Sequence, residues 1–339
     1  MKLIKYFSIL LIVAVVAVYF VQDTTYYQVL RGETMGTTYS IKIRTEKEDN
    51  MLHSRIKKEL ENINAQMSVF DKNSEINAIN NAEAGKWIEL SPEMSVLLND
   101  SYKIYKKSGG AFDPTIGKLA DLWGFGVNKT ERIPSQEEID EVLAYSGFDK
   151  IKFSNDYAKL KKEYPQTYMN LSAVAKGYGV DRIADFLKSE GYKNFLVEIG
   201  GEIYASGTRN KKGEKWHIGV MNPQDNSQNA AVVELSDSAV ATSGDYFNYF
   251  YSDNVRYSHT ISIQDGKPVR SNLTSVTVFA DTCTFADAYA TAFMVMGEKK
   301  GPEFADKNNM KVIFFVKNED GSISTVMSKA AEKMLKGAK

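Results

Sequence analysis

This chain is organised around one segment, which begins Asn170-Leu-Ser-Ala-Val-Ala-Lys-Gly-Tyr-Gly-Val-Asp181 and ends Phe195-Leu-Val-Glu-Ile-Gly-Gly-Glu202. Apolar residues at i, i+3, i+4 and i+7 from Val180 to Leu187 predict a helix that stops near Gly191. The apolar run after it predicts a buried strand. Backbone N–H groups at a helix start or in a glycine turn can bind an anion. The segment is therefore either a phosphate-binding element or an ordinary helix-strand unit.

The composition is that of a globular protein with a full core. Of 339 residues, 43% are hydrophobic and 25% are charged. Lys and Arg number 42 against 43 Asp and Glu, so the net charge is -1. Because nucleic-acid binding needs a basic face, this balance argues against nucleic acid as a partner. The single cysteine, Cys283, excludes an intramolecular disulfide.

The N-terminus has the pattern of a bacterial export signal. Lys2 and Lys5 precede an uncharged run over 6–21, and the first acidic residue is Asp23. No small-residue cleavage site is clear around 17–22, and no lipid-acceptor cysteine follows the run. We therefore favour an uncleaved anchor at residues 1–22 over a removed signal peptide. Residues 23–339 would then form one domain at the periplasmic face of the bacterial inner membrane.

Helices and strands alternate irregularly along the rest of the chain, which predicts an α+β fold in one continuous unit. Ser135 and Glu138 have the spacing of a capping box. The predicted helices cover 53–69, 91–109, 134–145 and 284–296, and one more follows residue 329. The predicted strands cover 29–44, 195–199, 216–220, 231–235, 247–251, 257–263, 275–279 and 312–316.

The common nucleotide and hydrolase motifs, among them Gly-x-x-x-x-Gly-Lys-Ser/Thr and Gly-x-Ser-x-Gly, are absent from the sequence. Asp287 and Thr291 are four residues apart, so a helix would place both oxygens on one face, where they could hold a hard cation such as Mg²⁺. The same region also fits a plain helix start, with Thr284 as the N-cap and Asp287 at the third helical position. Spacing alone leaves both interpretations open.

One of the three histidines is placed as a general base would be. His53 lies at a helix start and His217 in a strand, so both are expected to be structural or exposed. His259 precedes an Asp-Gly-Lys-Pro turn, and an imidazole in such a loop can accept a proton at neutral pH.

Nine short motifs follow one another through nearly the whole chain after the N-terminal run. They are Met35-Gly-Thr-Thr-Tyr39, Ser74-Glu-Ile-Asn-Ala-Ile-Asn80, Gly110-Ala-Phe-Asp-Pro-Thr-Ile-Gly117, Leu122-Trp-Gly-Phe-Gly126, Ala175-Lys-Gly-Tyr-Gly-Val-Asp181, Ile199-Gly-Gly-Glu202, Ala241-Thr-Ser-Gly-Asp-Tyr246, Ser258-His259 with Gly266-Lys-Pro268, and Ala286-Asp-Ala-Tyr-Ala-Thr291. In this order they resemble the ApbE family of FAD:protein FMN transferases of the bacterial periplasm.

The resemblance implies one large mixed α+β domain of the ApbE-like, T-fold-related class. It also implies an Mg²⁺-dependent enzyme that uses FAD as a substrate, transfers FMN to a Thr or Ser hydroxyl of a target protein, and releases AMP. The implied acceptors are flavin-carrying subunits of membrane redox complexes, of the Rnf type or of sodium-pumping quinone reductases.

Site residues follow from the motif positions under this resemblance. The implied metal ligands are the side chains of Asp287 and Thr291 and the main-chain carbonyl of Ala173. The implied FAD contacts are Met35, Phe70, Ala111, Phe112, Asp113, Asn170, Lys176 and Ile261, with Thr242, Ser243 and Gly244 as further contacts. His259 is the candidate base for the acceptor hydroxyl, and Asp245 is its rival.

Two positions depart from the family pattern. Asn170 stands where the family usually has Asp, and Ser262-Ile263 replaces the usual Asp-Pro after the histidine segment. Two other functions stay open: a pyrophosphatase that splits FAD into FMN and AMP, and a periplasmic flavin-binding protein without turnover.

Overall fold

The computed structural model describes residues 26–126, 132–245, 249–253 and 255–336. The anchor expected at residues 1–22 lies outside these ranges. Within them, no helix combines the length and the apolarity needed to cross a membrane.

The helices are α2 (Leu52–Met67), α3 (Glu75–Asn80), α4 (Pro92–Ser108), α5 (Gly117–Leu122), α6 (Gln136–Tyr145), the 3-10 turn η1 (Phe148–Lys150), α7 (Ala175–Ser189), α8 (Cys283–Lys307) and α9 (Lys329–Lys336). The strands are β1 (Tyr27–Thr34), β2 (Thr37–Arg44), β3 (Ile88–Glu89), β4 (Ile151–Phe153), β5 (Lys159–Lys162), β6 (Phe195–Ile199), β7 (Glu202–Ser206), β8 (Trp216–Asn222), β9 (Asp225–Leu235), β10 (Ser238–Gly244), β11 (Tyr249–Ser252), β12 (Val255–Ser258), β13 (Leu273–Ala280), β14 (Lys311–Lys317) and β15 (Ile323–Met327).

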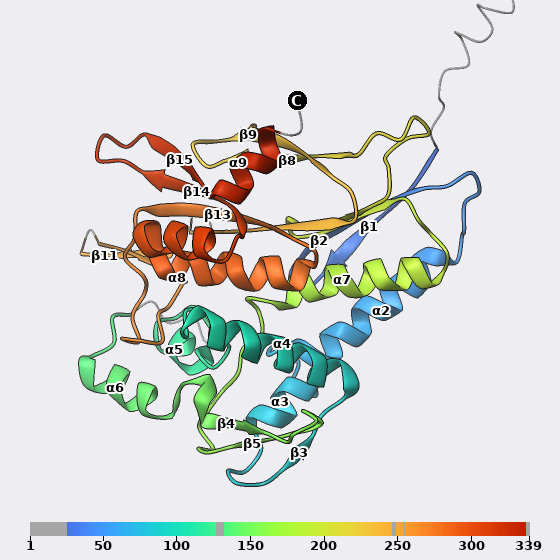
Figure 1. The fold of residues 1–339 in the computed structure, drawn as a ribbon. Helices are drawn as coiled ribbons and strands as arrows, with labels where there is room; N and C mark the ends of the chain where they lie inside the picture. Colours follow the sequence, from blue (N-terminus) through green and yellow to red (C-terminus); the bar gives the residue numbers. More distant parts are fainter. Residues whose placement is uncertain (1–25, 127–131, 246–248, 254, 337–339) are drawn as a thin grey trace, which may run out of the picture.

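An eight-stranded antiparallel sheet forms the centre of the molecule, in the order β1-β2-β6-β7-β10-β13-β14-β15. Helices α7 and α8 cover one face of it, while the β8–β9 hairpin and α9 lie over the other (Figure 1). Each face therefore buries its own apolar layer, as antiparallel sheets covered on both sides do. The α+β fold predicted from the sequence is confirmed.

A helical layer lies beyond α7 and α8, on the side away from the sheet (Figure 1). It contains α3 to α6 and the small sheet β3-β5-β4. Its apolar residues Leu97, Phe112 and Phe148 belong to the same core cluster as Ile41 and Phe293 of the sheet and α8. The apolar interior thus runs without a break from the sheet into this layer.

Local start and stop signals act where the sequence places them. Ser135 and Glu138 form both bonds of the predicted capping box at α6. Helix α4 begins at Pro92 and ends at Gly109, which adopts a left-handed φ of 65°. Helix α7 stops just before Gly191, as predicted.

Several predictions are wrong in detail. The single strand predicted over 29–44 is two strands, β1 and β2, because the chain turns back at Met35 and Gly36. The strand predicted over 257–263 ends at Ser258, because the chain turns back at Gly266 and leaves Ile261 in an isolated bridge with Pro268. Helix α8 continues to Lys307 through a break at Gly297. Strands β7 and β10 of the central sheet have no counterpart among the predicted strands, and neither do the edge strand β15 and the small sheet β3-β5-β4. The start of the strand predicted over 247–251 lies outside the described residues.

Candidate functional site

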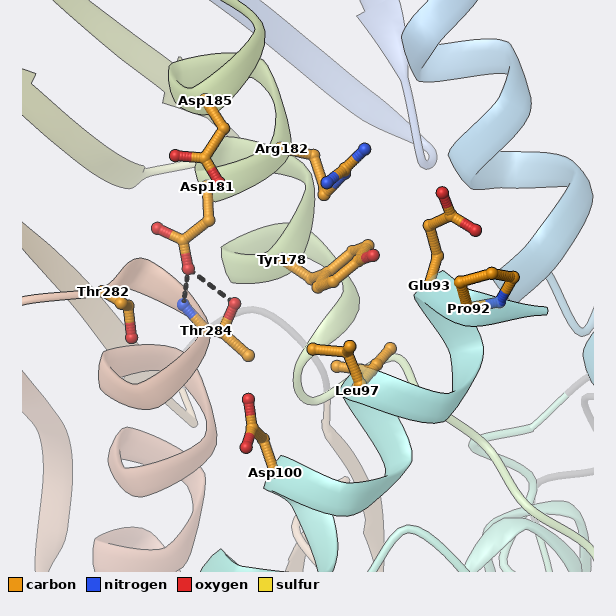
Figure 2. A pocket seen from close by; sticks show the side chains of 11 residues that line it. Pro92, Glu93, Leu97, Asp100, Tyr178, Asp181, Arg182, Asp185, Thr282 and Thr284 are labelled. Carbon is orange, nitrogen blue, oxygen red and sulfur yellow. Dashed lines mark hydrogen bonds between the residues drawn. The ribbon is translucent and has the colours of Figure 1, made fainter. Parts of the chain in front are cut away.

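Helices α7 and α8 cap each other. Asp287 of α8 accepts a 2.9 Å hydrogen bond from the Gly177 backbone N–H in the first turn of α7. One turn further along α7, Asp181 accepts bonds from the Cys283 and Thr284 backbone N–H groups at the start of α8, at 2.7 and 2.8 Å. Figure 2 shows the bond with Thr284. Each carboxylate neutralises unpaired donors and the positive end of the other helix.

The helix N-cap of α8 is Thr282, whose hydroxyl accepts from the Phe285 N–H. The alternative that made Thr284 the N-cap is therefore wrong. Thr284 instead donates its hydroxyl to Asp181 at 2.6 Å. Asp287 is consequently not a capping residue of its own helix, and its carboxylate is directed to α7.

Close contact between α7 and α8 depends on Gly177. A Cβ at this position would overlap the Cys283 carbonyl oxygen and lie 2.7 Å from the Asp287 Cβ. Only glycine therefore allows the Asp287 carboxylate to reach the backbone of α7.

A buried cluster of three charges forms around Asp287. The Lys176 Nζ lies 2.6 Å from Glu202 Oε1 and 3.9 Å from Asp287 Oδ1. Both carboxylates are only 2% exposed. Burial and the charge of Asp287 raise the pKa of Glu202 to about 8. Burial raises the pKa of Asp287, and although burial opposes it, the two carboxylates raise the pKa of Lys176.

Two hydroxyl groups lie further along α8. The Thr291 Oγ1 is 3.2 Å from the Ser243 Oγ of β10. The neighbouring residue Thr242 pairs instead with Thr277 of β13 at 2.8 Å. Because strand residues alternate between faces, Ser243 faces α8, whereas the Thr242 side chain lies on the opposite side of the sheet. Sequence reasoning did not separate the two.

The predicted metal ligands offer oxygen atoms only. Gly177, four residues after Ala173, donates its N–H to Asp287, and within the described ranges the Ala173 carbonyl accepts no hydrogen bond. Nowhere in the described chain do three His, Cys, Asp or Glu side chains gather as a metal site. A carboxylate, a hydroxyl and a free carbonyl suit Mg²⁺, which keeps waters and takes further oxygens from a phosphate. The residues present therefore fit this ion.

The loop over 110–117 meets the start of α7 through the backbone. The Asn170 N–H donates to the Pro114 carbonyl at 2.7 Å, and the Asn170 Oδ1 accepts from the N–H and hydroxyl of Ser172. The Asp113 carboxylate accepts from Thr115 and from the Phe148 N–H. Burial raises the pKa of Asp113 to about 6. This side chain therefore shapes the loop from within, beside the buried Ala111 and Phe112, the two preceding loop residues expected to contact FAD.

Met35 lies in the turn between β1 and β2, with a left-handed φ of 51°. Its methyl group packs on Gly179 of α7, where an added Cβ would come within 2.8 Å of the Met35 Cε. The structure thus brings this predicted FAD residue to the same helix as Lys176.

The two candidate bases have different neighbours. His259 meets the Phe125 ring edge-on at 6.5 Å. Trp123 donates its indole N–H to the Gly266 carbonyl at 2.8 Å and so ties down the loop that contains the buried Ile261. Asp245, next to Gly244, forms an ion pair with Arg256. The Asp245 carboxylate is therefore already engaged by a guanidinium.

Phe70 projects into solvent after α2, with 71% of its surface exposed. A hollow of about 310 Å³ is lined by Val69, the residue before Phe70, and by Lys72, Lys118 and Tyr168. The Lys118 Nζ lies 4.5 Å from the Tyr168 ring centroid. Asp121 also lines this hollow, so its charges are of both signs. An exposed aromatic ring such as Phe70 can stack on a flat group.

A second hollow, of about 320 Å³, lies between α4, α7 and the start of α8 (Figure 2). Its lining includes Glu93, Asp100, Asp181 and Asp185, with Arg182 as its cation. No predicted site residue lines it. Its negative charge is opposite to what a diphosphate requires, so it is not the nucleotide site.

Comparison with known proteins agrees with this arrangement. The chain matches the model of the ApbE family over residues 35–314. The FAD:protein FMN transferase of Vibrio cholerae serotype O1 is 38% identical over 297 residues, which are 86% of this chain and 88% of that protein. The protein of the same name from Haemophilus influenzae is 37% identical over 315 residues, or 90% of each chain.

Solved structures show the same fold. Flavin Transferase ApbE from Vibrio cholerae superposes with a TM-score of 0.84 at 35% identity, covering 91% of this chain and 99% of that one. The apo form of Pseudomonas stutzeri flavinyl transferase ApbE gives a TM-score of 0.84 at 33% identity, covering 91% and 97%. The chain belongs to the ApbE family.

Replacing Gly177 by Ala should destabilise the protein. Alanine favours a helix by about 0.5–1 kcal/mol, but the overlap with the α8 backbone should cost about 1–3 kcal/mol. Urea unfolding should therefore show a lower midpoint at an unchanged slope. Gly179→Ala is the matched control, because its methyl would meet only the ends of side chains, Met35 Cε at 2.8 Å and Ile199 Cδ1 at 3.3 Å, and no backbone atom. Equal midpoints for the two variants would contradict the close-packing argument.

Proposed function

We propose that this protein is an FAD:protein FMN transferase. The observation that carries the proposal is the half-buried Lys176 ammonium 3.9 Å from the buried Asp287 carboxylate at the α7–α8 junction, with the Thr291–Ser243 hydroxyls one turn further along α8. An ammonium and an all-oxygen cation site in one place suit a diphosphate. The family membership and the names of the relatives support the choice of FAD as the substrate.

The acceptor hydroxyl oxygen attacks the FMN phosphorus, the bond from that phosphorus to the bridging oxygen breaks, and AMP leaves. Such transfer depends on positioning and on neutralising charge. Asp287, Thr291 and the Ala173 carbonyl would hold Mg²⁺, which supplies positive charge to the diphosphate oxygens when bound. Lys176 contributes a second positive charge, and the exposed ring of Phe70 is placed to stack on a flat group.

The acceptor hydroxyl must lose its proton, and we propose that His259 is the base that accepts it. An imidazole is the side chain suited to accept a proton near neutral pH, whereas the Asp245 carboxylate is paired with Arg256. We propose that Asp245 instead holds Arg256 in place beside the end of β10, next to Ser243 and Gly244.

We further propose that the acceptors are flavin-carrying subunits of membrane redox complexes, such as the Rnf type or the sodium-pumping quinone reductases. The export-like N-terminal run supports a location at the periplasmic face of the inner membrane. A balanced net charge of -1 is consistent with protein and nucleotide partners, not with nucleic acid.

Incubation with FAD, Mg²⁺ and an acceptor domain should produce protein-bound flavin fluorescence that survives a denaturing gel. Asp287→Ala should lower the rate by about 10² to 10³-fold, and a chelator should do the same to the wild-type protein. Asp185→Ala, an exposed carboxylate on α7, is the control and should keep full activity. Free FMN and AMP without labelled acceptor would indicate a pyrophosphatase, and unchanged FAD would eliminate both enzymes.

Substitution of the two candidate bases should separate their roles. His259→Ala should slow single-turnover transfer by about 10² to 10⁴-fold, because the proton acceptor is lost. Asp245→Asn should cost less than about tenfold, since it loses only the pairing with Arg256. The control is His217→Gln, because His217 is exposed on β8 beside Glu234. A larger defect in Asp245→Asn than in His259→Ala would reverse the assignment.

A further inference from the structure

Glu202 is the third residue of the charged cluster around Asp287. Neither the motif that contains it nor the proposed transfer reaction gives it a role. It opens β7, directly after a turn in which Gly200 and Gly201 have φ values of 60° and 101°. Its Oε1 lies 2.6 Å from the Lys176 Nζ. Among the described residues, its buried Oε2 has no hydrogen-bond partner. A buried carboxylate is costly, so this one calls for an explanation.

The lysine has two carboxylates within reach, and it is closer to one of them. Nζ is 2.6 Å from Glu202 but 3.9 Å from Asp287 Oδ1. Opposite charges attract strongly in a buried site. Without Glu202, the ammonium would close on Asp287 and occupy the oxygen that a cation needs. The other oxygen of Asp287 is already bound to the Gly177 N–H.

The glycine turn directs the lysine chain toward Glu202. A Cβ on Gly200 would lie 3.3 Å from the Lys176 Cδ and 2.8 Å from the Thr37 Cγ2. The aliphatic part of Lys176 therefore runs along a surface that a side chain at position 200 would crowd. The turn joins the paired strands β6 and β7, and Glu202 is the first residue of β7. Its carboxylate lies at the end of the Lys176 side chain.

We propose that Glu202 is a positioning residue: it anchors the Lys176 ammonium and thereby keeps the Asp287 carboxylate open for a divalent cation. This inference rests on the proposed function, since it assigns Mg²⁺ to Asp287. Glu202 acts through Lys176 and does not itself bind the metal. The charge of Lys176 stays beside the site, at a distance set by Glu202.

A double-mutant cycle on Mg²⁺ affinity tests the proposal without measuring turnover. Mg²⁺ is titrated calorimetrically into the full chain without FAD, in the wild type, Glu202→Gln, Lys176→Met and the double variant. Glu202→Gln should weaken Mg²⁺ binding by about tenfold, as loss of an outer-shell partner does. In the Lys176→Met background the same change should alter affinity by no more than about twofold.

Glu198→Gln is the matched control, because Glu198 accepts from the Gly201 N–H in the same turn but does not touch Lys176. It should leave Mg²⁺ affinity within about twofold of the wild type. A crystal structure of Glu202→Gln should show Lys176 Nζ moved to hydrogen-bond distance from Asp287. If Glu202→Gln does not fold, Glu202→Asp, whose side chain is shorter, replaces it. Glu202→Asp should weaken Mg²⁺ binding when Lys176 is present and should not weaken it in Lys176→Met.

An equal loss in both backgrounds would overturn the inference, because Glu202 would then act on the metal directly. Unchanged affinity in Glu202→Gln, or an unmoved Lys176 in its structure, would overturn it as well. If the wild-type chain itself bound no Mg²⁺, the metal assignment of the proposed function would fall and this inference with it. Wild-type binding with an unaffected Glu202→Gln would overturn the inference alone.

Discussion

The reciprocal capping of α7 and α8 is the interaction on which the rest of the site depends. Asp287 binds the first turn of α7, and Asp181 binds the first residues of α8. Two helices that belong to distant parts of the chain are thereby held in one register. That register sets Lys176 against Asp287 and, one turn further along α8, Thr291 against Ser243 of the sheet.

Charge explains why such a junction can bind a cation. When both buried carboxylates are ionised they share a single ammonium, so the cluster then has more negative than positive charge. An incompletely compensated buried charge is unfavourable, and the raised pKa of Glu202, about 8, reflects it. A divalent cation would remove this imbalance and then face the phosphates with positive charge. The same excess of buried negative charge therefore lowers the stability of the junction without a cation and raises its affinity for a divalent cation.

Local sequence signals predicted much of the fold but less of the site. The end of α7, the capping box of α6 and the strand over 195–199 follow from periodicity and capping chemistry, which act within a few residues. Strand β10 was missed because Ser238–Gly244 consists largely of small residues and lacks the alternation of a half-buried strand. It is instead held in the sheet by pairing with β7 and β13 along its two edges.

The contacts within the site could not be predicted from spacing, because they join residues far apart in the chain. Glu202 stood in a recognised motif, yet only the fold shows that it meets Lys176. The choice between a capping and a metal role for Asp287 likewise needed α7, since its hydrogen bond crosses between helices. The resemblance to a family supplied the site residues, and the structure supplied the reason that several of them lie together.

The most direct test of this account is a crystal structure of the full chain with FAD and Mn²⁺, which substitutes for Mg²⁺ and can be located by its anomalous scattering. The account predicts one Mn²⁺ at about 2.1 Å from the Asp287 carboxylate and from the Thr291 hydroxyl, against the diphosphate. The Gly177 N–H should remain bound to Asp287. A metal bound in the acidic hollow of Figure 2 instead, with none at Asp287, would contradict it.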